Sequence, residues 1–208
     1  MARAADGEPK FEVRRSKVHG RGVFALKRIR KGTRLIEYLG ERVSHQEADR
    51  RYADKDERDN HTFLFTVDAR TVIDAGVDGN DARFFNHSCD PNCESIIESR
   101  RVWIEALRTI EPGEELTYDY QIVRDDSDPP DIDEIFACRC GAAQCRGTML
   151  WSKAEQKAKE REQALKEKQE KQDRQEKKKQ RKKAAARPAA AQPSRVVARR
   201  ARRKAVRR

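Results

Sequence analysis

Three cysteines in the pattern C-x-C-x4-C, Cys138, Cys140 and Cys145, lie roughly fifty residues downstream of Cys89. This spacing is tight enough for all four thiols to bind one metal ion. Four thiolates around one Zn²⁺ form a closed tetrahedral site with no open position for chemistry. The sequence therefore predicts one structural zinc ion that holds the C-terminal segment against the middle of the chain, close to the functional site.

Charge is distributed unevenly along the 208 residues, of which 40% are charged, with a mean hydropathy of −1.04. Residues 1–150 carry 24 Lys and Arg against 29 Asp and Glu, a net charge of −5, whereas residues 151–208 carry 23 against 7, a net charge of +16. So polar a composition does not suit one compact domain over the whole length. We expect a mildly acidic globular body followed by a strongly basic tail.

The five cysteines do not suggest a disulfide framework. Four of them fit the metal site, and we expect the fifth, Cys93, to be a small buried residue rather than a ligand. Residues 1–10 lack the apolar core of a secretion signal, and no apolar run approaches the roughly 20 residues that a membrane span requires. These features favour a reducing, soluble compartment and no membrane association.

Most of residues 11–120 reads as short strands separated by turns. One short helix is expected after the capping box Ser44-His-Gln-Glu47, ending near Tyr52. Arg100-Arg101 separates two apolar runs and predicts a tight hairpin. The strands that we expect cover Phe11–Arg15, Val23–Ala25, Leu35–Leu39, Thr62–Val67, Thr71–Asp74, Ser95–Ser99, Val102–Leu107 and Leu116–Tyr120. Many short strands with few helices indicate a mostly β body.

A second capping box, Ser152-Lys-Ala-Glu155, begins a stretch without Gly or Pro that runs to about Ala186. Acidic residues precede basic ones at i,i+4 spacing in this stretch, an order that stabilises a helix. Because apolar a and d positions are missing, the pattern predicts a solvated single helix and not a coiled coil. Beyond Pro188 the Ala/Arg/Pro-rich sequence is typical of disorder.

Five motifs occur in the order found in one known family: H-G-R-G-V-F-A (His19–Ala25), I-E-Y-L-G-E (Ile36–Glu41), R-F-F-N-H-S-C-D-P-N (Arg83–Asn92), G-E-E-L-T-Y-D-Y (Gly113–Tyr120) and C-R-C-G-A-A-Q-C-R-G (Cys138–Gly147). Over about residues 11–151 the chain resembles a SET domain with its post-SET zinc segment. The resemblance implies a fold of small β-sheets with a pseudoknot. It also implies a lysine methyltransferase that uses S-adenosylmethionine.

On this basis we expect a mostly β protein with a long charged C-terminal helix and a disordered basic tail. The expected segments are a disordered N-terminus (1–10), the SET domain (11–125), an acidic linker (126–137), the post-SET zinc segment (138–151), a charged single helix (152–186) and the tail (187–208).

The resemblance assigns cofactor contacts to the turn Gly20-Arg21-Gly22 and to Asn86 and His87. Glycine permits the close backbone approach that such a contact needs. The turn alone is also compatible with a simple strand connection, and Asn86-His87 with a loop cap. Cys89, a predicted zinc ligand two residues beyond His87, favours the functional interpretation of the pair.

Tyr120 matches the catalytic tyrosine of the family, whose hydroxyl would orient the amine and the sulfonium and stabilise the transition state. Tyr38 matches an aromatic residue that lines the lysine channel. Tyr118 matches the position where Phe or Tyr sets the number of methyl groups added, so we expect mono- or dimethylation. Packing into the core is the alternative for Tyr120 and Tyr38, and for Tyr38 the two interpretations are closely matched.

Methyl transfer from a sulfonium is an in-line displacement by a neutral amine, so positioning supplies most of the rate enhancement.

Tyr52 is a loose match to a cofactor-facing aromatic residue and is equally compatible with a surface tyrosine. Trp151 follows the zinc segment, where the family closes over the cofactor. It could equally anchor the helix that follows.

The lysine- and arginine-rich tail could bind nucleic acid without sequence preference, target the chain to a nucleus, or merely keep it soluble. We favour nucleic-acid binding, a monomer, and a basic substrate such as a histone, a histone-like DNA-packaging protein or another lysine-bearing protein. The composition favours a bacterial cytoplasm or nucleoid, with a nucleus or chromosome as the alternative. The competing functional hypothesis is a non-catalytic chromatin-binding protein that uses a SET-like body for recognition.

Overall fold

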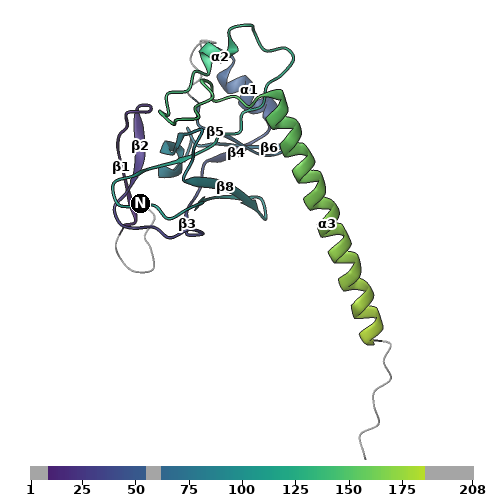
Figure 1. The fold of residues 1–208 in the computed structure, drawn as a ribbon. Helices are drawn as coiled ribbons and strands as arrows, with labels where there is room; N and C mark the ends of the chain where they lie inside the picture. The colour runs from purple at the N-terminus through teal and green to yellow at the C-terminus, as the bar shows by residue number, and fades with distance from the viewer. Residues whose placement is uncertain (1–8, 55–61, 186–208) are drawn as a thin grey trace, which may run out of the picture. The chain divides into compact units, whose positions relative to one another are not determined.

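The computed structural model describes residues 9–54 and 62–185 (Figure 1). The chain divides into two compact units, Met1–Gln156 and Lys157–Arg208. Most of the N-terminal segment for which we predicted disorder, and the whole tail from residue 187, lie outside the described residues.

The first sheet contains the segments that carry most of the predicted site. Its strand order is β1-β2-β10-β7, formed by β1 (Phe11–Arg15), β2 (Arg21–Ala25), β10 (Glu115–Tyr118) and β7 (Asn86–His87). β10 is antiparallel to β2 but parallel to β7, with Thr117 opposite Asn86 and Tyr118 opposite His87. The strand after the turn Gly20-Arg21-Gly22 therefore meets the segments that carry Asn86-His87 and Tyr118 in one sheet.

Two three-stranded antiparallel sheets complete the body. One contains β3 (Arg34–Glu37), β9 (Arg101–Ala106) and β8 (Cys93–Glu98), and the other contains β4 (Glu41–Val43), β6 (Thr71–Asp74) and β5 (Leu64–Asp68). The β8–β9 hairpin turns at Ser99 and Arg100, both with positive φ (50° and 63°), one residue earlier than predicted. Two central residues with positive φ match the twist of a two-residue hairpin.

Four helical segments are described: α1 (His45–Tyr52), the short 3₁₀ helix η1 (Asp81–Phe84), α2 (Ile132–Ile135) and α3 (Lys153–Ala185). Both predicted capping residues cap a helix. The hydroxyl oxygen of Ser44 accepts the N–H of Glu47 at 3.1 Å. At the start of α3, Glu155 N–H donates to the hydroxyl of Ser152, and Ser152 N–H donates to the Glu155 carboxylate. α2 lies within the stretch predicted as an acidic linker.

The core combines apolar residues from all three sheets. Its fully buried members include Val23, Phe85, Ile104 and Leu116. Strands outnumber helices in the first unit, which confirms the prediction of a mostly β fold of small sheets. Within the second unit, α3 is a polar helix on which Lys159 pairs with Glu162 and Leu165 is exposed. Across the described ranges, no helix has the length and apolar character needed to cross a membrane.

Candidate functional site

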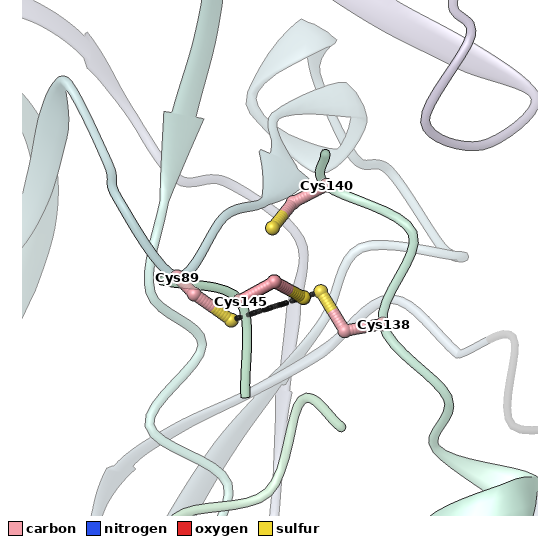
Figure 2. A group of neighbouring side chains, drawn as sticks. All are labelled: Cys89, Cys138, Cys140 and Cys145. Carbon is pink, nitrogen blue, oxygen red and sulfur yellow. Dashed lines mark hydrogen bonds between the residues drawn. The ribbon is translucent and has the colours of Figure 1, made fainter. Parts of the chain in front are cut away.

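The four predicted zinc ligands lie together. Their sulfur atoms are all within 4.8 Å of one another, with Cys89 Sγ 3.8 Å from Cys138 Sγ and 4.0 Å from Cys145 Sγ. Figure 2 shows the four thiols turned toward a common centre, with Cys89 approaching from the loop after β7 and the other three from the C-terminal segment. A tetrahedron with Zn–S bonds of about 2.3 Å has S–S edges of about 3.8 Å. The donor set and its spacing therefore fit one Zn²⁺.

Backbone groups support these sulfurs. Arg146 N–H donates to Cys89 Sγ and Gly147 N–H donates to Cys145 Sγ, each at 3.4 Å. Hydrogen bonds of this kind orient thiolate ligands and stabilise their charge. Cys93 is fully buried, outside the cluster, with a pKa raised by burial to about 12, as expected for a small core residue.

Asn86 holds the turn that contains Gly20, Arg21 and Gly22. Its side-chain amide lies 3.2 Å from the carbonyl of His19, 3.0 Å from that of Arg21 and 2.8 Å from Glu115 Oε1. A Cβ on Gly22 would lie 2.2 Å from the same Glu115 oxygen. A side chain there would displace the Glu115 carboxylate and crowd Ser16 Cβ. The four predicted residues form one group with Glu115, which was not singled out from the sequence.

His87 connects this strand to both the cysteines and Tyr120. It is buried, its Nδ1 accepts the Tyr120 N–H at 3.2 Å, and its Nε2 lies 3.5 Å from Cys89 Sγ. Because Nδ1 is an acceptor, Nε2 carries the proton and donates to the sulfur. Burial lowers the pKa of His87 to about 4, Asp119 opposing and Arg146 reinforcing that shift. His87 is therefore neutral near pH 7.

The three predicted tyrosines form an aromatic group. The ring centroids of Tyr118 and Tyr120 are 5.0 Å apart, and the Tyr120 hydroxyl donates to the Phe85 carbonyl at 2.9 Å. Tyr38 is buried, and its hydroxyl donates to the Phe63 carbonyl at 3.1 Å. Burial raises the pKa of all three phenols above the usual value of tyrosine.

The hydroxyl of Tyr118 differs from the other two. Among the residues that the structure describes it has no hydrogen-bond partner, although the side chain is buried. A buried tyrosine hydroxyl usually finds a partner. This O–H is therefore available to an incoming water or amine.

Phenylalanines that the sequence analysis did not single out join the tyrosines. Phe65 lies 5.2 Å from Tyr38 between ring centroids, and Phe63 contacts Phe84 edge to face. Phe63 precedes β5, Phe65 lies in it and Phe84 ends η1, so no local sequence pattern groups them. A surrounding of neutral phenols and phenyl rings disfavours an ammonium ion and suits a neutral amine.

Tyr52 binds the end of β6 and lies within electrostatic reach of Tyr38. Its hydroxyl donates to Asp74 Oδ1 at 3.0 Å, at the end of β6, where Arg51 also binds Asp74. The structure thus places Tyr52 against the β4-β6-β5 sheet, whereas Asn86 and His87 belong to the first sheet.

Asp119 directly follows β10 and lies between Tyr118 and Tyr120. Its side chain binds residues that follow the cysteines. Its carboxylate accepts two N–H bonds from Arg146, each 2.9 Å long, and one from Trp151 Nε1 at 3.0 Å. Burial would raise the pKa of Asp119, but these donors lower it below its usual value. Trp151 is thus attached to the tyrosine strand. Neither Asp119 nor Arg146 was singled out from the sequence.

Comparison with known proteins identifies the family that this chain resembles. The family model described as SET domain matches residues 20–121. The chain is 43% identical over 138 residues to "Histone-lysine N-methyltransferase trithorax" of Drosophila virilis. It is 44% identical over 140 residues to "Histone-lysine N-methyltransferase, H3 lysine-4 specific" from Saccharomyces cerevisiae, and equally to its namesake from Emericella nidulans. Each alignment covers 64% of this chain but only 3%, 12% and 11% of those relatives.

Proposed function

Because this chain belongs to the SET-domain family, we propose that it is a protein-lysine N-methyltransferase that transfers a methyl group from S-adenosylmethionine to a lysine side chain. The observation that carries the proposal is the position of His87, bonded to Tyr120 on one side and to Cys89 on the other. His87 thereby connects the end of β10 to the four-cysteine cluster. Asn86, the neighbouring residue, binds the turn Gly20-Arg21-Gly22.

In this proposal, the turn Gly20-Arg21-Gly22 with Asn86 and His87 holds the cofactor, and Trp151 borders it. The bound cofactor supplies an electrophilic methyl group. The Tyr120 hydroxyl, now bonded to the Phe85 carbonyl, orients the incoming amine and stabilises developing charge. Cys89, Cys138, Cys140 and Cys145 hold one structural zinc ion, which keeps the C-terminal segment in place.

The chain's own residues favour the reactive form of the substrate by positioning and by exclusion of water. Tyr38, Phe65 and the neighbouring rings make a low-dielectric surrounding in which a neutral amine is preferred over an ammonium ion. Of the nearby carboxylates described, Asp119 is already engaged by three N–H donors. The amine therefore reaches the site after losing its proton to solvent, and no side-chain base is needed.

Tyr118 limits the product to mono- or dimethyllysine in this proposal. Its hydroxyl has no described protein partner and can hold a water or the amine, which leaves too little room for a third methyl group. The substrate is a basic protein: a histone, in keeping with the names of the relatives, or a histone-like DNA-packaging protein.

The competing hypothesis, a chromatin-binding protein without activity, predicts that the cofactor site is unused. Calorimetric titration with S-adenosylhomocysteine separates the two, because an enzyme of this class must bind its product cofactor and a pure recognition module need not. Absence of binding by zinc-loaded protein would favour the competitor.

The direct test is transfer of labelled methyl from S-adenosylmethionine to a panel of basic proteins, followed by mapping of the labelled lysine. Tyr120→Phe should reduce turnover by about 10²-fold or more, as loss of a positioned electrostatic donor does. Tyr118→Phe is the matched comparison, because it removes the neighbouring phenol whose hydroxyl has no described partner, and the rate of the first transfer should stay near wild type. Equal rates for wild type and Tyr120→Phe would refute the assigned role.

A further inference from the structure

The basic residues of the body are concentrated in one stretch of sequence. Residues 10–34 carry ten Lys and Arg against a single Glu, a net charge of +9. The remainder of residues 1–150 carries 14 Lys and Arg against 28 Asp and Glu, a net charge of −14. A body that is acidic as a whole therefore contains one strongly basic segment, of which methyl transfer as proposed above uses only the turn Gly20-Arg21-Gly22.

This stretch forms the β1–β2 hairpin and the connection to β3. β1 is an edge strand, and the register places Arg15 directly opposite Arg21. Like charges in directly opposed positions destabilise an antiparallel pair. Both arginines are exposed, as is Lys17 in the turn between the strands. Such a cluster is relieved by an anion that binds both strands.

A second cluster lies at the other end of the hairpin. Arg30 and Lys31 are exposed, and neither they nor Lys27 form an ion pair with any described residue. The backbone between them is fixed, because buried Ile29 and Ile110 exchange two N–H···O bonds of 2.9 Å. These cationic side chains therefore extend from a backbone that is fixed by hydrogen bonds.

The basic hairpin, defined as Arg15, Lys17, Arg21, Lys27, Arg30 and Lys31, has dimensions that suit a polyphosphate. Its two clusters are separated by the length of β1, about 13 Å at about 3.3 Å per residue. Duplex DNA carries one negative charge per roughly 1.7 Å of axis. Both clusters can therefore contact phosphates of one duplex.

We propose that the basic hairpin binds the phosphate backbone of duplex DNA without sequence preference. This site belongs to the globular body and is separate from the basic C-terminal segment. It does not depend on the proposed methyl transfer, since a recognition protein could use it equally. In a methyltransferase it would hold the body on DNA while the acidic remainder faces a basic protein.

The test uses the full chain with Lys27, Arg30 and Lys31 all replaced by Gln, and a short duplex DNA of mixed sequence in fluorescence anisotropy. These positions lie beyond the glycine turn, so methyl transfer to a short peptide and the thermal midpoint should be unchanged. Loss of about three phosphate contacts should weaken binding roughly tenfold or more near physiological salt. It should also reduce the slope of log K against log salt by about 2–3.

The control variant replaces Arg42, Arg50 and Arg70, exposed residues of β4, α1 and the β5–β6 turn, with Gln. It removes the same charge from the body and should change DNA affinity less than about threefold. Equal losses in both variants would show that net charge alone matters and overturn the proposal.

Hydrogen exchange provides a second measurement that the basic tail does not obscure. Addition of DNA should slow exchange of amides within residues 10–34. If protection instead falls wholly outside that range, the proposal is wrong. It is also wrong if the triple variant keeps the DNA affinity of the wild-type protein.

Discussion

Both terminal guanidinium nitrogens of Arg146 donate to the carboxylate of Asp119, with two N···O distances of 2.9 Å. Each side chain is only 19% exposed. Arg146 directly follows Cys145, a member of the cysteine cluster, and Asp119 lies between Tyr118 and Tyr120. One paired contact therefore connects the cysteine segment with the strand end that carries the predicted catalytic tyrosine.

Arg146→Gln should lower the free energy of unfolding by about 3 kcal/mol, because it leaves a largely buried carboxylate without its cation. Arg146→Lys should recover only part of this loss, since an ammonium cannot reproduce the paired geometry. Urea unfolding of the zinc-loaded protein measures both.

Lys153→Gln is the control for this pair. The substitution breaks the ion pair between Lys153 and Asp126, whose side chains are 70% and 92% exposed, respectively. Exposed pairs contribute about 1 kcal/mol or less. A Lys153 variant as unstable as the Arg146 variant would contradict the importance assigned to the buried pair.

Removal of zinc should loosen residues 138–147 while the sheets persist, because the main hydrophobic cluster contains no residue of that segment. Cys140→Ser should abolish stoichiometric zinc binding, accelerate amide exchange in that segment and shift the fluorescence of Trp151. Exchange and zinc content by mass spectrometry check this. Cys93→Ala, which alters a buried thiol outside the cluster, should keep one zinc per chain. Unchanged exchange after metal removal would disprove the structural role.

Tyr118→Phe should move the product toward trimethyllysine with little loss of the first transfer. The substitution removes the one hydroxyl of the tyrosine group that has no described partner, so no protein hydrogen bond is broken. Intact-mass analysis of a methylated peptide over time gives the product distribution. Abundant trimethyllysine from the wild-type protein would contradict the limit placed on Tyr118.

Activity should rise with pH between about 7 and 9, because the substrate lysine, with an ordinary pKa of about 10.4, must lose its proton. Burial raises the pKa of Tyr38, Tyr118 and Tyr120, so these phenols stay neutral throughout that range. The same raised pKa values affect folding. Neutral tyrosines stabilise the folded state below the unfolded pKa of about 10, and this contribution is lost as pH rises further.

A pH profile of kcat/KM, together with tyrosinate absorbance, checks both statements. A falling limb below about pH 10 that coincides with phenolate formation would contradict them.

Local features of this fold are readable from sequence because their causes are local. Ser44 and Ser152 cap helices through bonds to residues three positions away, and short apolar runs bounded by turns become strands. The predicted β8–β9 turn is one residue too late, because Ser99 and Arg100 adopt positive φ and neither residue type favours that conformation. Pairing with the neighbouring strand imposes that conformation.

The site divides in the same way. Cysteine spacing predicted the metal cluster, and the family motifs supplied Asn86, His87 and Tyr120. The bond between Asp119 and Arg146 joins residues 27 positions apart, and no periodic pattern links them. It emerges only when the C-terminal segment folds back onto β10.

The parallel pairing of β10 with β7 has a consequence for synthesis of the chain. Asn86 and His87 leave the ribosome well before their partners Thr117 and Tyr118, and Cys89 precedes Cys145 by a still longer interval. Non-local pairings of this kind form slowly, and a half-made sheet exposes an unpaired edge. We therefore expect the nascent polypeptide to need protection from aggregation until its last cysteine emerges, and the yield of folded protein to depend on zinc supply.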